Sequence, residues 1–127
     1  MNNREIRFRA LEYDIKLMWD VLLIDWDHQE VRVKRGNLVK TSELKFFKLL
    51  QFTDLHDKNG KPIFEGDIVE VWFPGMPHNL RATQEIMFID GAFGCGTYPL
   101  NLINKASIEI IGNIFENSQL LNDQKNE

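Results

Sequence analysis

The spacing of apolar residues in the first third of the chain predicts short β-strands. Residues 4–12 (REIRFRALE) begin with apolar and charged side chains in alternation, which is typical of a half-buried strand. Residues 17–26 (LMWDVLLIDW) are apolar enough for a buried strand and too short and β-branched to favour an isolated helix. Alternation returns at residues 31–34, and Gly36-Asn37 ends that strand.

The middle of the chain passes from an ambiguous segment to clear turn chemistry. Residues 42–50 fit a capped helix or a strand, and we expect a short turn or helix leading into a strand at 48–53. Residues 57–60 (DKNG) predict a turn, because Asp accepts hydrogen bonds from backbone two residues on and Asn-Gly adopts positive φ readily. Pro62 has no N–H donor, so it belongs at a strand entrance or edge.

Further strands and turns follow in the last part of the chain. The expected strands lie at residues 68–72, 86–89 and 107–115. Asp90-Gly91 is expected to turn the second of these strands back, and Gly112 to form a bulge or close-contact point in the last. A short helix is expected to end at Leu121, before a frayed polar tail.

Short strands at close spacing, separated by Gly and Pro, predict a mainly β fold arranged as a small barrel or sandwich. The length of 127 residues fits one domain or two small subdomains that share a core. Charge and patterning both change near residues 37–48. We therefore divide the chain into a β-rich part at residues 1–45 and a part with a small β-barrel and a short C-terminal helix at 46–127.

Composition indicates a soluble protein of a reducing cytoplasm. Hydrophobic residues make up 43% of the chain and aromatic residues 11%, which is enough for a packed interior. The longest apolar run has four residues, whereas a membrane-spanning helix needs about 20. The first residues lack the apolar core of a signal peptide. The single cysteine, Cys95, cannot form an internal disulfide or a multi-cysteine zinc site.

Charge is unevenly distributed, although the net value is only −4. Residues 1–50 contain ten Lys or Arg and eight Asp or Glu (+2), and residues 51–127 contain five and eleven (−6). Only one stretch is a candidate basic surface for nucleic acid. It contains Arg32, Lys34, Arg35, Lys40, Lys45 and Lys48. The simpler interpretation, which we favour, is a solvated strand edge whose cations discourage aggregation.

Two groups of carboxylates and histidine are candidate metal sites. Asp54, His56 and Asp57 fall in the first, but placing Gly60 at the sixth position of a calcium loop leaves its first and last ligands missing. In the second, Asp25-Trp26-Asp27-His28, the two carboxylates would share one face of a strand. For both groups we favour turn or strand-end chemistry over metal binding.

Cys95 and the aromatic residues are weaker candidates for function. Cys95 lies between two glycines whose spacing does not match a phosphate-binding loop, so a hairpin turn is the favoured interpretation. The three tryptophans and nine phenylalanines are expected mainly in the core. If Trp72, Phe73 and Phe93 share an exposed face, they could stack on bases or bind a peptide.

Three segments resemble the YopX family of phage and prophage proteins. Residues 4–10 (REIRFRA) are similar to that family's REIKFRAW, residues 50–69 (LQFTDLHDKNGKPIFEGDIV) to QYTGLKDKNGKEIYEGDIV, and residues 112–121 (GNIFENSQLL) to GNIYENPELL. The segments follow in the family's order and span nearly the whole chain. Three departures are Leu11 for Trp, Asp54 for Gly and Ser118 for Pro.

The resemblance implies a phage-encoded, largely β protein with a small SH3-like barrel in its second half. It also implies a homo-oligomer, and it supplies no catalytic residue, cofactor or metal ligand. The expected motif is structural, a pair of turns in a barrel hairpin. Its residues are Asp57, Asn59, Gly60, Glu65, Gly66 and Asp67.

We therefore expect a non-enzymatic binding or assembly module in the cytoplasm of the bacterial host, with a phage or host protein, or a second copy, as its partner. No cofactor and no membrane are expected to take part. The alternatives are a nucleic-acid-binding accessory protein in phage replication or recombination and, less favoured, a metal-dependent hydrolase.

Overall fold

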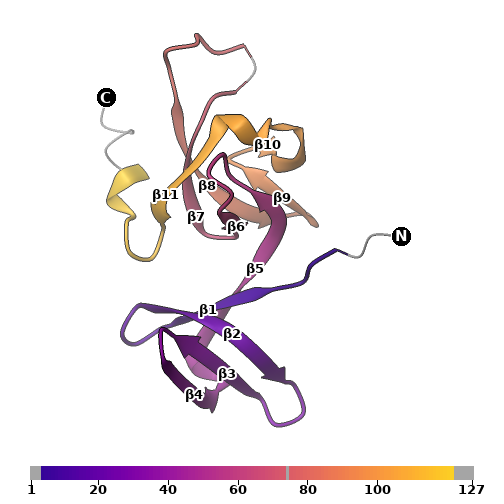
Figure 1. Ribbon diagram of the computed structural model, residues 1–127, viewed down its shortest axis with the longest axis vertical. Helices are drawn as coiled ribbons and strands as arrows, with labels where there is room; N and C mark the ends of the chain where they lie inside the picture. Colours follow the sequence, from indigo (N-terminus) through magenta and orange to yellow (C-terminus); the bar gives the residue numbers. More distant parts are fainter. Residues whose placement is uncertain (1–3, 74, 122–127) are drawn as a thin grey trace. The chain divides into compact units, whose positions relative to one another are not determined.

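Antiparallel β-strands make up most of the chain, which confirms the mainly β class (Figure 1). The computed structural model describes residues 4–73 and 75–121. The chain divides into two units, Met1–Phe52 (unit 1) and Thr53–Glu127 (unit 2). Among the described residues, no helix has the combination of length and apolar character that crossing a membrane requires.

Unit 1 is a sheet whose strands follow one another almost in sequence order, β4-β3-β2-β1-β5. The strands are β1 (Phe8–Glu12), β2 (Leu17–Asp25), β3 (Glu30–Arg35), β4 (Leu38–Glu43) and β5 (Phe47–His56). A 3₁₀ helix at Leu44–Phe46 leads into β5, which confirms the expected turn or helix before that strand. The last residues of β5 belong to unit 2.

One face of the unit 1 sheet forms a core. Its buried members are Ala10, Trp19, Val31, Val33 and Phe47. Along β3 the buried residues alternate with exposed cations, as the period-two pattern predicts. At the edge of this core, the carboxylate of Glu12 accepts hydrogen bonds from Trp19 Nε1 and from Lys40 Nζ, both at 3.0 Å.

Three expectations for unit 1 were incomplete or wrong. Residues 4–7 lie outside β1, so Ile6 is 65% exposed instead of packed. A register shift between Val21 and Leu23 in the β2–β3 pairing disrupts the expected buried strand, and Leu22 and Leu23 are both exposed. Strand β4 was missed, because LVKTSE has neither a continuous apolar run nor clean alternation.

Unit 2 contains a second antiparallel sheet with the order β10-β9-β8-β7-β11. Its strands are β7 (Asp67–Val71), β8 (Ala82–Ile89), β9 (Ala92–Cys95), β10 (Tyr98–Pro99) and β11 (Ile108–Asn113). Strand β6 (Pro62–Phe64) pairs with the end of β5, and 3₁₀ helices occupy Leu100–Leu102 and Lys105–Ser107. The core residues are Ile63, Val69, Val71, Ile86, Cys95, Leu100, Ile103 and Ile108.

Several local expectations for unit 2 were correct. Strand β6 begins at Pro62, and Asp90-Gly91 forms the β8–β9 turn with φ of 53° and 81°. The register of β11 against β7 shifts between Ile110 and Gly112, which confirms the bulge. Residues 119–121 are helical, as expected, whereas the tail at 122–127 lies outside the described residues.

A small SH3-like barrel was expected within residues 46–127, and the sheet observed there does not close into a barrel. The unit 2 sheet is open, with β10 at one edge and β11 at the other. Strand β10 has only two residues, and its second, Pro99, has no N–H to donate. A strand that stops there cannot carry the hydrogen-bond ladder around to close a barrel.

Candidate functional site

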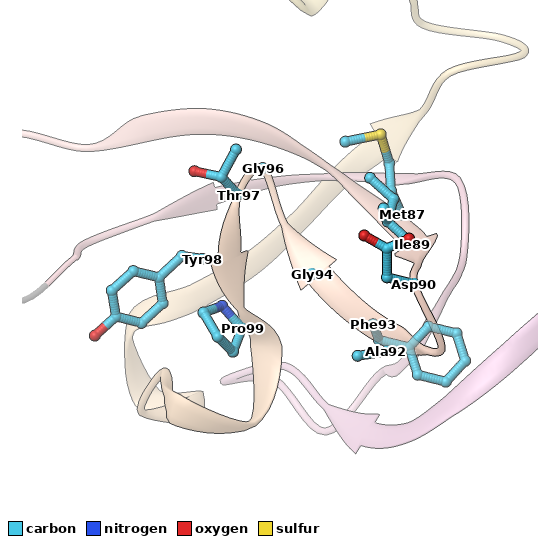
Figure 2. Close-up of a pocket in the computed structure, with 10 residues that line it drawn as sticks. All are labelled: Met87, Ile89, Asp90, Ala92, Phe93, Gly94, Gly96, Thr97, Tyr98 and Pro99. Carbon is cyan, nitrogen blue, oxygen red and sulfur yellow. The ribbon is translucent and has the colours of Figure 1, made fainter.

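A groove of about 310 Å³ lies on the β8–β9–β10 part of unit 2 (Figure 2). Its lining comprises Met87, Ile89, Asp90, Ala92, Phe93, Gly94, Gly96, Thr97, Tyr98 and Pro99. Apolar surface predominates among them, and Asp90 is the one residue of the ten that carries a charge at neutral pH. The hollow can therefore accept an apolar side chain beside a single carboxylate.

The register of one hairpin forms the floor of the groove. The two-residue turn pairs Ile89 with Ala92 and Met87 with Gly94, and both pairs lie on the same face of the sheet. The opposite face carries the pair Ile86 and Cys95, which is buried in the core. Each pair on the outer face thus joins a large side chain with a small one. The missing side-chain volume at Ala92 contributes to the hollow, whereas at Gly94 the backbone of the returning segment takes up that space.

The returning segment forms the wall of the groove. Tyr98 pairs with Cys95 and Pro99 pairs with Gly94, which brings this segment beside β9. A Cβ on Gly94 would lie 3.1 Å from the carbonyl oxygen of Gly96, so the close approach favours glycine. The Tyr98 ring packs on Phe73, with 5.3 Å between ring centroids. The wall is therefore held by both backbone pairing and side-chain packing.

Cys95 lies below the groove floor and is not a nucleophile in this structure. The side chain is fully buried in the unit 2 core. Burial raises the pKa of the Cys95 thiol to about 11, which keeps it protonated at neutral pH. Its role is packing, and the flanking glycines belong to the hairpin and the groove.

Asp57 organises the turn of the predicted structural motif. It is only 2% exposed, and its Oδ1 accepts hydrogen bonds from the backbone N–H groups of Asn59 and Lys61, both at 2.9 Å. Its Oδ2 accepts from the N–H of Ile110 in β11 at 3.0 Å. Burial alone would raise the pKa of Asp57, but these three donors outweigh it and the pKa is lowered.

The second half of this motif uses another buried carboxylate. Asp67 Oδ2 accepts from the Phe64 N–H at 2.8 Å and so bridges the tight turn between β6 and β7. Gly66 in that turn has a φ of 88°, and Gly60 in the preceding turn has a φ of 80°. Glu65 is partly exposed beside them. The carboxylates of Asp57 and Asp67 thus accept hydrogen bonds from backbone N–H groups.

The two candidate metal groups form no cluster. Strand β2 ends at Asp25, so Asp25 and Asp27 do not share a strand face. The Asp25 carboxylate instead contacts the ring and the backbone N–H of His28, at 2.7 and 3.1 Å. Among residues 54–57, Asp54 is exposed and Asp57 bonds to backbone. In the part of the chain that the structure describes, no three metal-ligating side chains gather.

The candidate basic stretch is divided between surfaces. Arg32 and Lys34 are exposed on the outer face of β3, and Arg35 donates to the carbonyl of Met18 at 2.8 Å. Lys40 lies on the other face, with its Nζ 4.7 Å from the Trp19 ring centroid. The two remaining members are elsewhere: Lys45 pairs with Glu43 at 3.2 Å, and Lys48 lies on β5.

The aromatic residues have mixed environments. Trp19 is buried, whereas Trp26 is 60% exposed in the β2–β3 turn. Trp72, Phe73 and Phe93 are all half-buried. Trp72 stacks on His78 at 5.5 Å, and Phe93 packs against Phe88 at 4.9 Å. These three aromatics therefore have separate neighbours.

The groove was missed in the sequence, although a signal for it exists. A two-residue turn at Asp90-Gly91 dictates which residues face each other across the hairpin. Counting outward from that turn opposes Ile89 to Ala92 and Met87 to Gly94. Large–small opposition on one face indicates a hollow. The contribution of residues 96–99 could not be found in this way, because it depends on the path of the returning chain.

Comparison with known proteins identifies the family. The profile described as YopX protein matches residues 7–122. The chain belongs to the YopX family. The three segments quoted above therefore reflect family membership. Among curated proteins no match is found.

Two solved structures resemble this YopX-family chain over most of its length. Protein EF1440 from Enterococcus faecalis is 26% identical, with a TM-score of 0.65, and the match covers 94% of this chain and 99% of that one. Protein yopX from Bacillus subtilis is 18% identical, with a TM-score of 0.61 and coverage of 91% and 97%. At 18% identity, the similarity to yopX from Bacillus subtilis shows a shared fold.

Proposed function

We propose that this chain is a non-enzymatic binding or assembly module. It would bind a protein partner in the cytoplasm of a bacterium that carries a phage or prophage. The observation that carries the proposal is the preformed groove lined by Ala92 and Gly94. Its floor is part of a hydrogen-bonded hairpin, so little conformational entropy is lost when a partner enters. Membership of the YopX family supports the phage setting.

The size and lining of the groove favour a protein side chain as its occupant. Burying one aliphatic side chain stabilises a complex by about 1.5–3 kcal/mol, which is too little for stable binding alone. The groove is therefore an anchor point within a wider contact. Ile89 in the lining is 52% exposed, so part of its side chain remains open to contact with a partner.

The chemistry of the lining supports binding over catalysis. Asp90 lies at the hairpin turn, and the hydroxyl-bearing residues Thr97 and Tyr98 lie on the opposite wall (Figure 2). Acid–base or nucleophilic catalysis uses a positioned set of titratable groups. Cys95, the strongest potential nucleophile nearby, is buried under the floor and protonated.

The test compares a substitution that fills the groove with a matched control. Ala92→Leu fills the hollow from an exposed position, and Ala106→Leu adds the same side chain at an exposed position outside the groove. Each variant is used as bait in lysate of phage-infected host, with light scattering of the purified protein in parallel. We expect Ala92→Leu to lose about tenfold in partner retention or self-association and Ala106→Leu to match the unmodified chain.

Equal behaviour of the two variants would overturn the proposal. The covalent structure of any retained partner is then compared by intact mass before and after incubation. A non-enzymatic module leaves that mass unchanged, whereas a mass change that depends on the chain would contradict the non-enzymatic part.

A second candidate function is nucleic-acid binding, favoured by Arg32 and Lys34 on the outer face of β3. Fluorescence anisotropy with single- and double-stranded DNA and RNA at low salt tests it. Binding that is lost in Arg32→Ala/Lys34→Ala would support this candidate, and no binding at low salt would remove it.

A further inference from the structure

We infer that the groove of one copy of the chain receives residues 4–6 (Arg-Glu-Ile) of a second copy. The inference rests on the proposed function and names the partner of the same site. It joins two features of the chain that match in chemistry. One is an apolar hollow with a single carboxylate, and the other is an exposed isoleucine with a nearby cation.

The segment before β1 has unusual exposure for its composition. Residues 4–7 are described but belong to no strand, and Ile6 is 65% exposed. The Arg7 guanidinium lies 3.6 Å from the Glu5 carboxylate, which offsets that negative charge. Arg4 is also exposed. The segment thus offers one apolar side chain and one cation on backbone outside the sheet.

Residue spacing in this segment fits the groove. In an extended chain, Arg4 and Ile6 point to the same side, and Glu5 points to the other. The β9 strand has four residues, so the floor is about 13 Å long. Asp90 lies at one end of that floor, at the turn, and Gly94 lies further along it. Ile6 can therefore occupy the hollow while Arg4 reaches Asp90.

Charge supports the same pairing. Residues 51–127 carry six more acidic than basic side chains, whereas residues 1–50 carry two more basic than acidic. A contact between the first part of one copy and the second part of another is attractive, and contact between two acidic parts is repulsive. Asp90 is the charge at the groove itself, so a cationic segment is preferred over an anionic one.

Other cationic segments of the chain fit the groove less well. Arg32 and Lys34 lie on β3, which is paired on both sides by β2 and β4 and cannot enter a groove as a single strand. In the edge strand β4, Lys40 turns toward Glu12 at the core rim. Among the described residues, two other exposed pairs outside the strands and 3₁₀ helices, Ile15–Lys16 and Leu80–Arg81, join an apolar residue to the cation next to it, so their side chains would point to opposite sides of an extended chain. Arg4 and Ile6 are two residues apart and share one side, which the groove requires.

The test uses three substitutions with matched controls and light scattering at about 0.1 mM protein, because a small contact is expected to be weak. Ile6→Asp removes the apolar anchor, and its control is Ile15→Asp at an exposed turn position of the same unit. Ala92→Leu fills the hollow, with Ala106→Leu as its control. We expect Ile6→Asp and Ala92→Leu each to weaken self-association about tenfold and both controls to leave it unchanged.

Asp90→Asn tests the charge alone. Asp90 and Asp54 are both exposed and both have positive φ, of 53° and 68°, so Asp54→Asn makes the same chemical change on a similar backbone away from the groove. We expect Asp90→Asn to weaken self-association and reduce its dependence on salt, and Asp54→Asn to change neither. Equal effects of the two would contradict a specific contact with Asp90.

Mixing the defective variants decides whether the contact forms between copies. The Ile6→Asp chain retains its groove, and the Ala92→Leu chain retains its N-terminal segment. Their mixture is expected to form a one-to-one dimer that neither forms alone. A monomeric unmodified chain, or a mixture that stays monomeric, would overturn the inference. If self-association is absent but Ala92→Leu weakens the binding of a different protein, the proposed function stands and only the inference is wrong. If Ala92→Leu weakens no protein contact, the proposed function and the inference are both wrong.

Discussion

The two units of the chain are stabilised in different ways. In unit 1, β1 to β4 form a meander in which strands adjacent in sequence pair, β5 pairs with the distant β1, and the core side is apolar. The contact between Glu12 and Lys40 lies at the rim of that core. Unit 2 joins β7 to the distant β11, and two buried carboxylates, Asp57 and Asp67, complete its turns.

This difference predicts different responses to substitution. In unit 1 the fold follows from alternation, which many side chains of similar hydrophobicity can maintain. In unit 2 particular oxygen atoms satisfy buried N–H groups, and no apolar replacement can accept those hydrogen bonds. Removing a polar group should therefore cost more in unit 2 than in unit 1.

The largest expected effect is that of Asp57→Asn. The amide NH₂ would face backbone N–H groups that the carboxylate now accepts from, so we expect a loss of about 2–3 kcal/mol in the free energy of unfolding. Urea unfolding measures the loss, and hydrogen exchange places it within unit 2. The control Asp54→Asn changes an exposed residue and should cost little. Equal losses would contradict the role of Asp57.

The same carboxylate predicts acid sensitivity. The folded-state pKa of Asp57 is lowered below its ordinary value of 3.8. Its contribution is therefore present above pH 3.8 and is lost as the pH falls through the folded-state pKa. The stabilities of the unmodified chain and Asp57→Asn should converge once the pH falls below the folded-state pKa of Asp57. Stabilities that stay apart would assign the acid sensitivity to other groups.

The second effect concerns Cys95. A thiol with a pKa of about 11 is ionised about 100-fold less at pH 8 than one with the ordinary value of 9.0, and burial further blocks reagents. We expect iodoacetamide to react at least about 100-fold more slowly with the folded chain than with the urea-unfolded chain. Reaction at similar rates would show that the unit 2 core opens readily.

A smaller effect is expected for Glu12→Gln in unit 1. The amide can still accept one hydrogen bond but loses its charge toward Lys40, so we expect a loss of about 1 kcal/mol. The Trp19 indole resonance reports the local change during thermal unfolding. Glu43→Gln, whose partner Lys45 is exposed, should have almost no effect. A loss as large as that of Asp57→Asn would remove the contrast between the units.

The smallest effect belongs to His28 in the β2–β3 turn. Its hydrogen bond to Asp25 raises the pKa of His28 above 6.5. This contribution is complete below pH 6.5 and is lost as the pH rises through the folded-state pKa. An NMR titration should show the His28 pKa falling toward 6.5 in Asp25→Asn. An unchanged value would show that the pair does not persist in solution.

Much of the strand layout could be predicted because it depends on local signals. The alternation at Val31 and Val33, the entrance at Pro62 and the bulge at Gly112 each reflect the preference of a few neighbouring residues. Strand β4 could not be predicted in this way, since its pairing with β3 gives LVKTSE an extended form that its own pattern does not demand.

By itself, the sequence determined the mainly β class, most turns and the family, because hydrophobic period, Gly and Pro constraints and short motifs are local properties of the chain. Tertiary structure decided that the unit 2 sheet stays open, that Asp57 reaches Ile110, and that residues 96–99 return beside β9 to complete the groove. Those outcomes depend on contacts between residues distant in sequence, whose geometry is set only when the strands pair and pack.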